Sequence, residues 1–195
     1  MKSAKGIKGI IIALICVALI LGYYYYLSNV KEETRQEDNV TATAVQEVLL
    51  KDLENNYPPT PKEVVKFYSA ITQCFYSETY TDEQLYAMAA QIQKLYDDEL
   101  VANKTQQQYM DDLKIEIANM KDNECVISSY ATSASTDVEY YSKGGFDWAK
   151  LRCSYTIRQK TALASTNEVF LLRKDDAGHW KIYGWKLAEE DESSN

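Results

Sequence analysis

The chain has 195 residues, 46% of them hydrophobic and 26% charged, so it is too apolar for a disordered tail and short enough for one folded domain with appendages. The formal net charge is −8. Residues 29–195 alone hold 18 basic against 29 acidic residues, a net charge of −11. Such an acidic segment repels phosphate backbones, so nucleic acid is excluded as an expected partner.

A membrane span is predicted near the start of the chain. Residues 9–27 form a run of 19 residues without a charge, which as a helix would span roughly 28 Å, close to a bilayer core. Three lysines precede the run and four tyrosines end it, so residues 1–8 are expected in the cytoplasm and the rest of the chain outside. A cleaved signal peptide is the alternative, because residues 10–21 have the length of its apolar region. The bulky tyrosines argue against a cleavage site there.

The remainder of the chain divides into three parts. Residues 28–42 are polar, charge-dense and free of aromatic residues, which predicts a stalk. Residues 43–188 have the apolar periodicity of a folded domain, which the orientation of the span places outside the cytoplasm. Residues 189–195 form an acidic tail. The protein is therefore expected in the cell membrane, with a single span as its membrane contact.

Helical spacing of apolar residues fills the first half of the domain. A first helix is predicted from Val45. Three more are expected behind the N-caps Thr60, Thr81 and Thr105, each followed by Glu or Gln three residues later, which is the pattern of a capping box. The helix after Thr81 is predicted to run to about Ala102.

After Cys125 the period of the apolar residues changes from 3.6 to 2, which is typical of strands. Strands are predicted at residues 126–133, 136–142, 148–161, 166–174 and 179–187. In the strand at 148–161 apolar and polar residues alternate strictly, which predicts one buried face and one solvent-exposed face. Because all helices precede all strands, the fold class is predicted to be α+β with an antiparallel sheet.

The last hairpin resembles that of the nuclear transport factor 2-like superfamily. The resemblance rests on residues 170–174, Gly178, residues 180–182 and Trp185, and it covers roughly residues 61–187. It implies helices packed on a curved antiparallel sheet that forms a cone with a pocket. Four helices before the sheet depart from the commonest element order of that superfamily. Because the fold hosts isomerases, dehydratases, binding modules and scaffolds, the resemblance implies no substrate.

The plan of the whole chain is similar to that of a family of membrane-anchored proteins from Gram-positive bacteria. The shared features are the lysine-rich start, one span, the segment Asn-Tyr-Pro-Pro-Thr-Pro at residues 56–61 and the strand-rich end. No activity comes with that resemblance.

Tyrosines on apolar faces are the main candidates for a pocket. Tyr68, Tyr96 and Tyr155 lie on such faces, and Glu99 follows Tyr96 by three residues. The superfamily resemblance implies an acid and a tyrosine or histidine inside the cone of its proton-transferring members. Packing at the edge of the core is the alternative interpretation of these tyrosines.

Trp185 completes the candidate ligand-binding residues. Trp180 and Trp185 are separated by an odd number of positions, so a regular strand would point them to opposite faces. A bulge at Gly184 would place both on one side. The candidates are therefore Tyr68, Tyr96, Glu99, Tyr155 and Trp185.

Neither a metal nor a cofactor is expected, and no catalytic residue is assigned. His179 is the only histidine and lies beside a predicted turn, which favours a surface position. Cys74 and Cys153 fall on apolar faces, which favours buried thiols. No histidine pattern or Cys-x-x-Cys pair supports a metal site.

Two classes of function remain. A binding or scaffolding module for an envelope protein, a peptide or a wall polymer needs only an apolar and aromatic lining, and this is the expected function. The alternative is a small-molecule acid–base enzyme of the isomerase or dehydratase type. Burial of Glu99, Glu139 or Glu168 beside a candidate tyrosine would favour the enzyme, whereas a filled interior would favour a scaffold.

Overall fold

The computed structural model describes residues 42–188, which contain five α-helices, one short 3-10 helix and five strands. The helices are α2 (Ala44–Leu50), α3 (Pro61–Ser77), α4 (Asp82–Gln93), α5 (Asp98–Ala102) and α6 (Gln106–Asp122). The strands are β1 (Cys125–Thr132), β2 (Glu139–Lys143), β3 (Phe146–Gln159), β4 (Ala162–Lys174) and β5 (Trp180–Leu187), with η1 (Ser135–Asp137) before β2. No helix of this part of the chain is long and apolar enough to span a bilayer. The span predicted at residues 9–27 lies outside the described residues.

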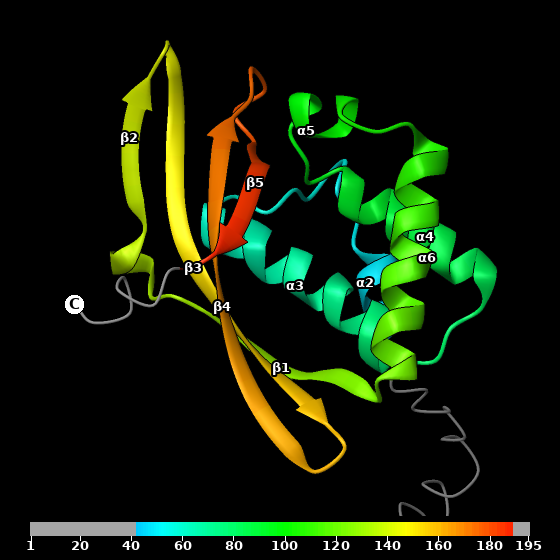
Figure 1. The fold of residues 1–195 in the computed structure, drawn as a ribbon. Helices are drawn as coiled ribbons and strands as arrows, with labels where there is room; N and C mark the ends of the chain where they lie inside the picture. The colour runs from blue at the N-terminus through cyan, green and yellow to red at the C-terminus, as the bar shows by residue number, and fades with distance from the viewer. Residues whose placement is uncertain (1–41, 189–195) are drawn as a thin grey trace, which may run out of the picture. The chain divides into compact units, whose positions relative to one another are not determined.

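The prediction of an α+β fold with an antiparallel sheet is confirmed. The strands follow the order β1-β3-β4-β5, and β2 also pairs with β3. Strand β1 pairs with the second half of β3 and β2 with the first half, both antiparallel. The long strands β3 and β4 bend and twist along their length, and the helices lie on one side of the sheet (Figure 1).

The predicted helix starts are confirmed. Thr81 and Thr105 each accept a hydrogen bond from the backbone N–H three residues later, and a glutamine side chain bonds back to the cap backbone. Thr60 accepts from the Glu63 N–H at 3.2 Å, and Pro61 occupies the first helical position. These contacts satisfy N–H groups that have no partner within the helix.

The predicted length of the helix after Thr81 is wrong, because α4 ends at Gln93. The next residues pair instead with the edge of the sheet: the Ile182 N–H donates to the Leu95 carbonyl at 2.7 Å, and the Asp97 N–H donates to the Ile182 carbonyl at 2.9 Å. Asp97 then caps α5 by accepting from the Glu99 N–H at 3.0 Å. This pairing covers the open edge of β5 and directs Tyr96 toward the interior.

The core lies between the helices and the inner face of the sheet. Along β3 the inward residues Ala149, Leu151, Cys153 and Tyr155 are buried, as the alternation predicts. Cys74 and Cys153 are buried free thiols, also as predicted.

A bulge in β5 brings two tryptophans to the same face. Ile182 lies opposite Leu172, but Gly184 lies opposite Leu171, so Tyr183 is the additional residue between them. After this shift Trp185 lies opposite Phe170 on the inner face. The bulge considered at Gly184 is therefore present.

Candidate functional site

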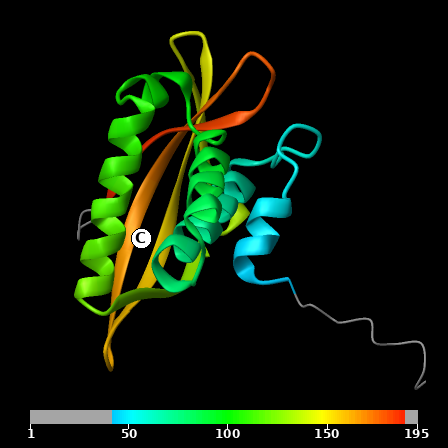
Figure 2. The same cartoon turned by 90° about the vertical axis from the view of Figure 1, so that its right-hand side faces the viewer.

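The domain holds a cavity between its helices and its sheet. One part, the helical chamber, has a volume of about 480 Å³ and lies among α3, α4, α5, α6 and the end of β5. The adjoining sheet chamber, of about 440 Å³, lies over β1, β3 and β4. The two chambers share five lining residues and therefore adjoin; these residues are Tyr68, Thr72, Tyr76, Glu116 and Trp185. Helix α6 runs alongside the long strands (Figure 2) and supplies the outer wall.

Four of the six aromatic residues that line the helical chamber contact one another: Tyr68, Tyr96, Tyr109 and Trp185. The ring centroids of Tyr68 and Trp185 are 5.3 Å apart, and those of Tyr96 and Trp185 are 5.9 Å apart. Tyr109 meets Tyr96 edge to face at 6.4 Å. Burial raises the pKa of Tyr68 and of Tyr96 well above the ordinary tyrosine range, so both phenols stay neutral. The structure therefore brings three of the predicted candidates, Tyr68, Tyr96 and Trp185, into one wall.

The sheet chamber contains a half-buried carboxyl group. Glu168 lies opposite Cys153 in the β3–β4 register, so its side chain shares the inner face. Burial raises its pKa from 4.5 to about 7. Within residues 42–188 this carboxyl has no hydrogen-bond or ion-pair partner, so it is available to a ligand.

The fourth predicted candidate, Tyr155, lines the same chamber and is tied to the core. Its hydroxyl is 2.7 Å from Ser69 Oγ, which also lies 3.4 Å from Cys153 Sγ. Burial, followed by the neighbouring Cys153, raises the pKa of Tyr155 far above its usual range. The phenol is therefore a fixed neutral group between Glu168 and the buried Ser69.

The charged side chains of the lining are mostly acidic. Lys104 is the only basic residue that the described chain contributes to either chamber, and it pairs with Asp112 at 2.6 Å. Glu116 lies at the junction of the chambers and accepts a hydrogen bond from the Tyr76 hydroxyl at 3.0 Å. With Glu168, the lining therefore has an excess of carboxylates.

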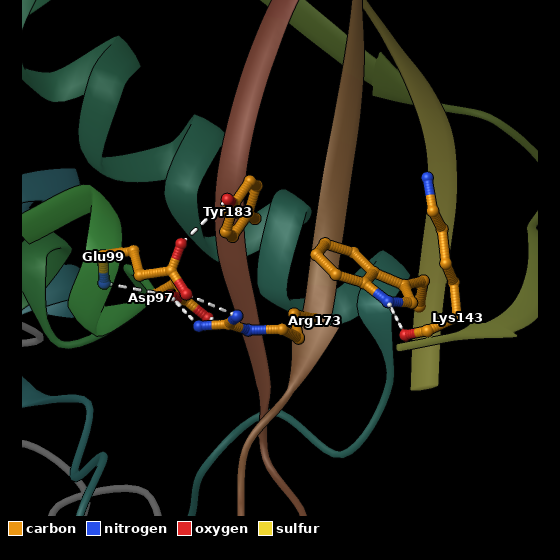
Figure 3. Close-up of polar contacts among 6 residues, drawn as sticks. Asp97, Glu99, Lys143, Arg173 and Tyr183 are labelled. Carbon is orange, nitrogen blue, oxygen red and sulfur yellow. Dashed lines mark hydrogen bonds and ion pairs between the residues drawn. The ribbon is translucent and has the colours of Figure 1, made fainter. Parts of the chain in front are cut away.

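The fifth predicted candidate, Glu99, lies apart from the residues that line the cavity. Its carboxylate accepts hydrogen bonds from Arg173 at 2.7 Å and from Tyr183 at 2.8 Å (Figure 3). Arg173 also holds Asp97, with nitrogen–oxygen distances of 2.6 and 2.9 Å. This cluster fixes the α4–α5 connection, and with it Tyr96, to the sheet.

Aromatic rings surround Arg173 on the same side. Its guanidinium carbon lies 4.7 Å from the ring centre of Phe146, 5.1 Å from that of Tyr183 and 5.7 Å from that of Trp148. Both carboxylates and all three rings thus engage one cation, so this arrangement is a structural tie rather than an open site.

His179 lies at the β4–β5 turn, outside the cavity lining. The imidazole stacks on Tyr57 with ring centres 4.4 Å apart, and its Nδ1 is 3.8 Å from Asp175. Among the described residues, no group of three potential ligands could hold a metal ion.

Sequence reasoning considered Glu168 but did not include it among the pocket candidates. Four apolar residues follow Glu168, Val169 to Leu172, so apolar and polar residues do not alternate along β4. The sequence therefore does not show on which face of the strand Glu168 lies. The register with Cys153 resolves it.

An α+β domain with an aromatic and acidic cavity between helices and sheet is thus the class that the fold defines. The model of the family described as "Domain of unknown function (DUF6715)" matches residues 1–185, and the chain belongs to that family. The matched region includes the segment predicted to span the membrane. A comparison with curated proteins finds no match.

Proposed function

We propose that residues 42–188 form a binding domain for a small molecule that occupies the cavity. The observation that carries the proposal is the pair of adjoining chambers lined by Tyr68, Tyr96 and Trp185, of about 480 and 440 Å³. A pure scaffold needs a filled interior, whereas concave, aromatic-lined spaces of this size are typical of ligand sites.

Acid–base catalysis is a second candidate function, favoured by Glu168. Its pKa of about 7 suits proton transfer near neutrality, and the neutral phenols of Tyr68 and Tyr155 lie close enough for the carboxylate to raise their pKa values further. A ligand with an acidic carbon–hydrogen bond beside Glu168 would turn the binding site into an isomerase or dehydratase site.

The proposal extends to fold family and location. The curved antiparallel sheet packed on helices and the last hairpin support a nuclear transport factor 2-like fold, although the element order departs from the commonest one. The uncharged run at residues 9–27 and the lysines before it support a single-span anchor with the domain outside. In that position the domain would meet ligands or envelope partners on the outer face of the membrane.

Blocking the cavity tests the proposal. Thr72 lines both chambers on α3, so Thr72→Trp places a large side chain where they join. Lys66→Trp adds the same ring at an exposed position of the same helix and serves as the matched control. The full chain, in a nonionic maltoside detergent, would be screened by saturation-transfer NMR against small aromatic compounds that are cationic, neutral or anionic.

We expect binders that lose their signal with Thr72→Trp and keep it with Lys66→Trp. Absence of any binder, or binders that Thr72→Trp does not affect, would overturn the proposal. For the acid–base candidate, hydrogen–deuterium exchange at carbon in a bound compound, abolished by Glu168→Gln, is the expected result. Binding without such exchange would leave the domain a binding module only.

A further inference from the structure

We infer that the ligand of this cavity is an organic cation with an apolar body, held by the aromatic wall and the excess of carboxylates in the lining. This inference rests on the proposed function, because it names the class of ligand for the same cavity.

The balance of charge in the lining is the first observation. The two chambers contain three carboxylates and one lysine, and that lysine pairs with Asp112. Among the described residues Glu168 has no basic partner, whereas Glu116 lies within electrostatic range of Lys104. An anionic ligand would still meet two more carboxylates than lysines in the lining, whereas a cation would meet complementary charge.

The aromatic wall is the second observation. Tyr68, Tyr96, Tyr109 and Trp185 converge on one chamber, with neighbouring ring centres 5.3 to 6.4 Å apart. The faces of such rings are electron-rich and attract cations within about 6 Å of the ring centre. Burial keeps Tyr68, Tyr96 and Tyr109 neutral, with the pKa of Tyr109 raised to about 12. The three tyrosine side chains therefore stay neutral, with hydroxyl groups able to form hydrogen bonds, throughout the physiological pH range.

Arg173 shows how this domain holds a cation among rings and carboxylates. Elsewhere in the domain, Arg173 lies among three rings and two carboxylates, and it satisfies all of them. The cavity repeats this combination of rings and acids, and the one basic residue that the described chain contributes to its lining, Lys104, pairs with Asp112. A ligand cation would complete the same set of contacts.

Glu168 couples this binding to pH. The groups that face it are Tyr68 and Tyr76 from α3, Cys153 and Tyr155 from β3, and Glu116 from α6. Of these, the three tyrosines and Cys153 have raised pKa values and stay neutral near pH 7. A cation prefers the ionised form of Glu168, so its affinity should rise between pH 6 and pH 8.

Three compounds with the same ring separate the ligand classes: benzyltrimethylammonium, benzyl alcohol and phenylacetate. Each would be titrated into the full chain in the maltoside detergent and followed by calorimetry. We expect the cation to bind about tenfold or more tightly than the other two, because ring and carboxylate contacts add to its affinity alone. Trp185→Leu should weaken the cation about tenfold. Tyr141→Leu removes an exposed ring outside the cavity and should leave its affinity unchanged.

The pH profile distinguishes a direct role of Glu168 from a structural one. In the unmodified protein the affinity for benzyltrimethylammonium should rise severalfold from pH 6 to pH 8, and Glu168→Gln should flatten this profile. Tighter binding of benzyl alcohol or phenylacetate, blocked by Thr72→Trp, would overturn the cation inference and leave the proposed function standing. Failure of all three compounds, together with the absence of any Thr72→Trp-sensitive binder, would overturn both.

Discussion

Trp185 lies opposite Phe170 across the β4–β5 pair, and the two rings stack with centroids 6.0 Å apart. The bulge at Tyr183 causes this register, because without it Trp185 would face away from the cavity. One additional residue in β5 therefore supplies one of the three rings that the two chambers share.

The two tryptophans of β5 should differ in their effect on stability. Trp180 is 8% exposed and packs in the core, whereas Trp185 is 39% exposed at the cavity. Trp180→Ala should cost about 3 to 5 kcal/mol, enough to unfold much of the population, and Trp185→Ala about 1 to 2 kcal/mol. Urea melts followed by circular dichroism measure both. Equal losses would show that Trp185 is core rather than cavity wall.

Glu168→Gln should stabilise the domain above neutral pH. Because burial raises the pKa of the folded carboxyl from 4.5 to about 7, the folded state binds more protons than the unfolded state between these values, and stability falls as pH rises through them. After allowance for partial exposure, the penalty above pH 7 is roughly 1 to 2 kcal/mol. Urea melts at pH 5 and pH 8 should show this difference in the unmodified protein and lose it in the variant. A pH-independent difference would contradict the raised pKa.

Arg173→Met should destabilise the α4–α5 connection. The change leaves the Asp97 carboxylate, whose side chain is 5% exposed, without its partner, at a cost of about 2 kcal/mol or more. Glu99→Gln is the control and should cost much less, because its partner contacts are exposed to solvent. Combining Arg173→Met with Asp97→Asn should restore part of the loss, as a double-mutant cycle would show. Simple additivity of the two changes would mean that the pair contributes no coupling.

Ser69 and Tyr155 should show a non-additive effect. Ser69→Ala removes the partner of a buried phenol at a cost of about 1 to 2 kcal/mol, whereas Tyr155→Phe leaves Ser69 with its Cys153 contact. The double variant should therefore lose less than the sum of the single losses. The cycle would be measured by urea unfolding, and an additive result would rule out the hydrogen bond as a stabilising contact.

The membrane anchor is tested on intact cells. A tag placed after Asn195 should be removed by added protease if residues 9–27 span the bilayer with the lysines inside. A cytoplasmic marker protein provides the control for cell integrity. Protection of the tag in cells that also protect the marker would contradict the predicted orientation.

The sequence predicted most of the elements because their signals are local. Thr60, Thr81 and Thr105 begin helices through contacts that reach only three residues, and the alternation along β3 follows from burial of one face. The α4–α5 break was missed because its cause is distant. Leu95 and Asp97 leave the helix to pair with Ile182, and no nearby residue signals that contact.

The site was predictable only in part for the same reason. Apolar periodicity identified Tyr68 and Tyr96 as inward-facing residues. Their convergence with Trp185 depends on the bulge in β5, and periodicity is compatible with that bulge but does not predict it. Glu99 follows Tyr96 by three residues, but its carboxylate binds Arg173 outside the cavity lining. A local pattern indicates which face a residue occupies on its own element, and the partner across the fold decides what that residue does.

The most direct test of the central claim is the indole N–H signal of Trp185 during a titration with benzyltrimethylammonium. The chain has three tryptophans, and Trp185→Phe assigns the relevant signal in a nitrogen-15 spectrum of the full chain in maltoside micelles. Trp148 serves as the internal control, because it lies outside the lining of the cavity. Binding of the cation against the aromatic wall should produce a saturable shift of the Trp185 signal and leave the Trp148 signal unchanged. An unmoved Trp185 signal, or equal shifts of both, would contradict it.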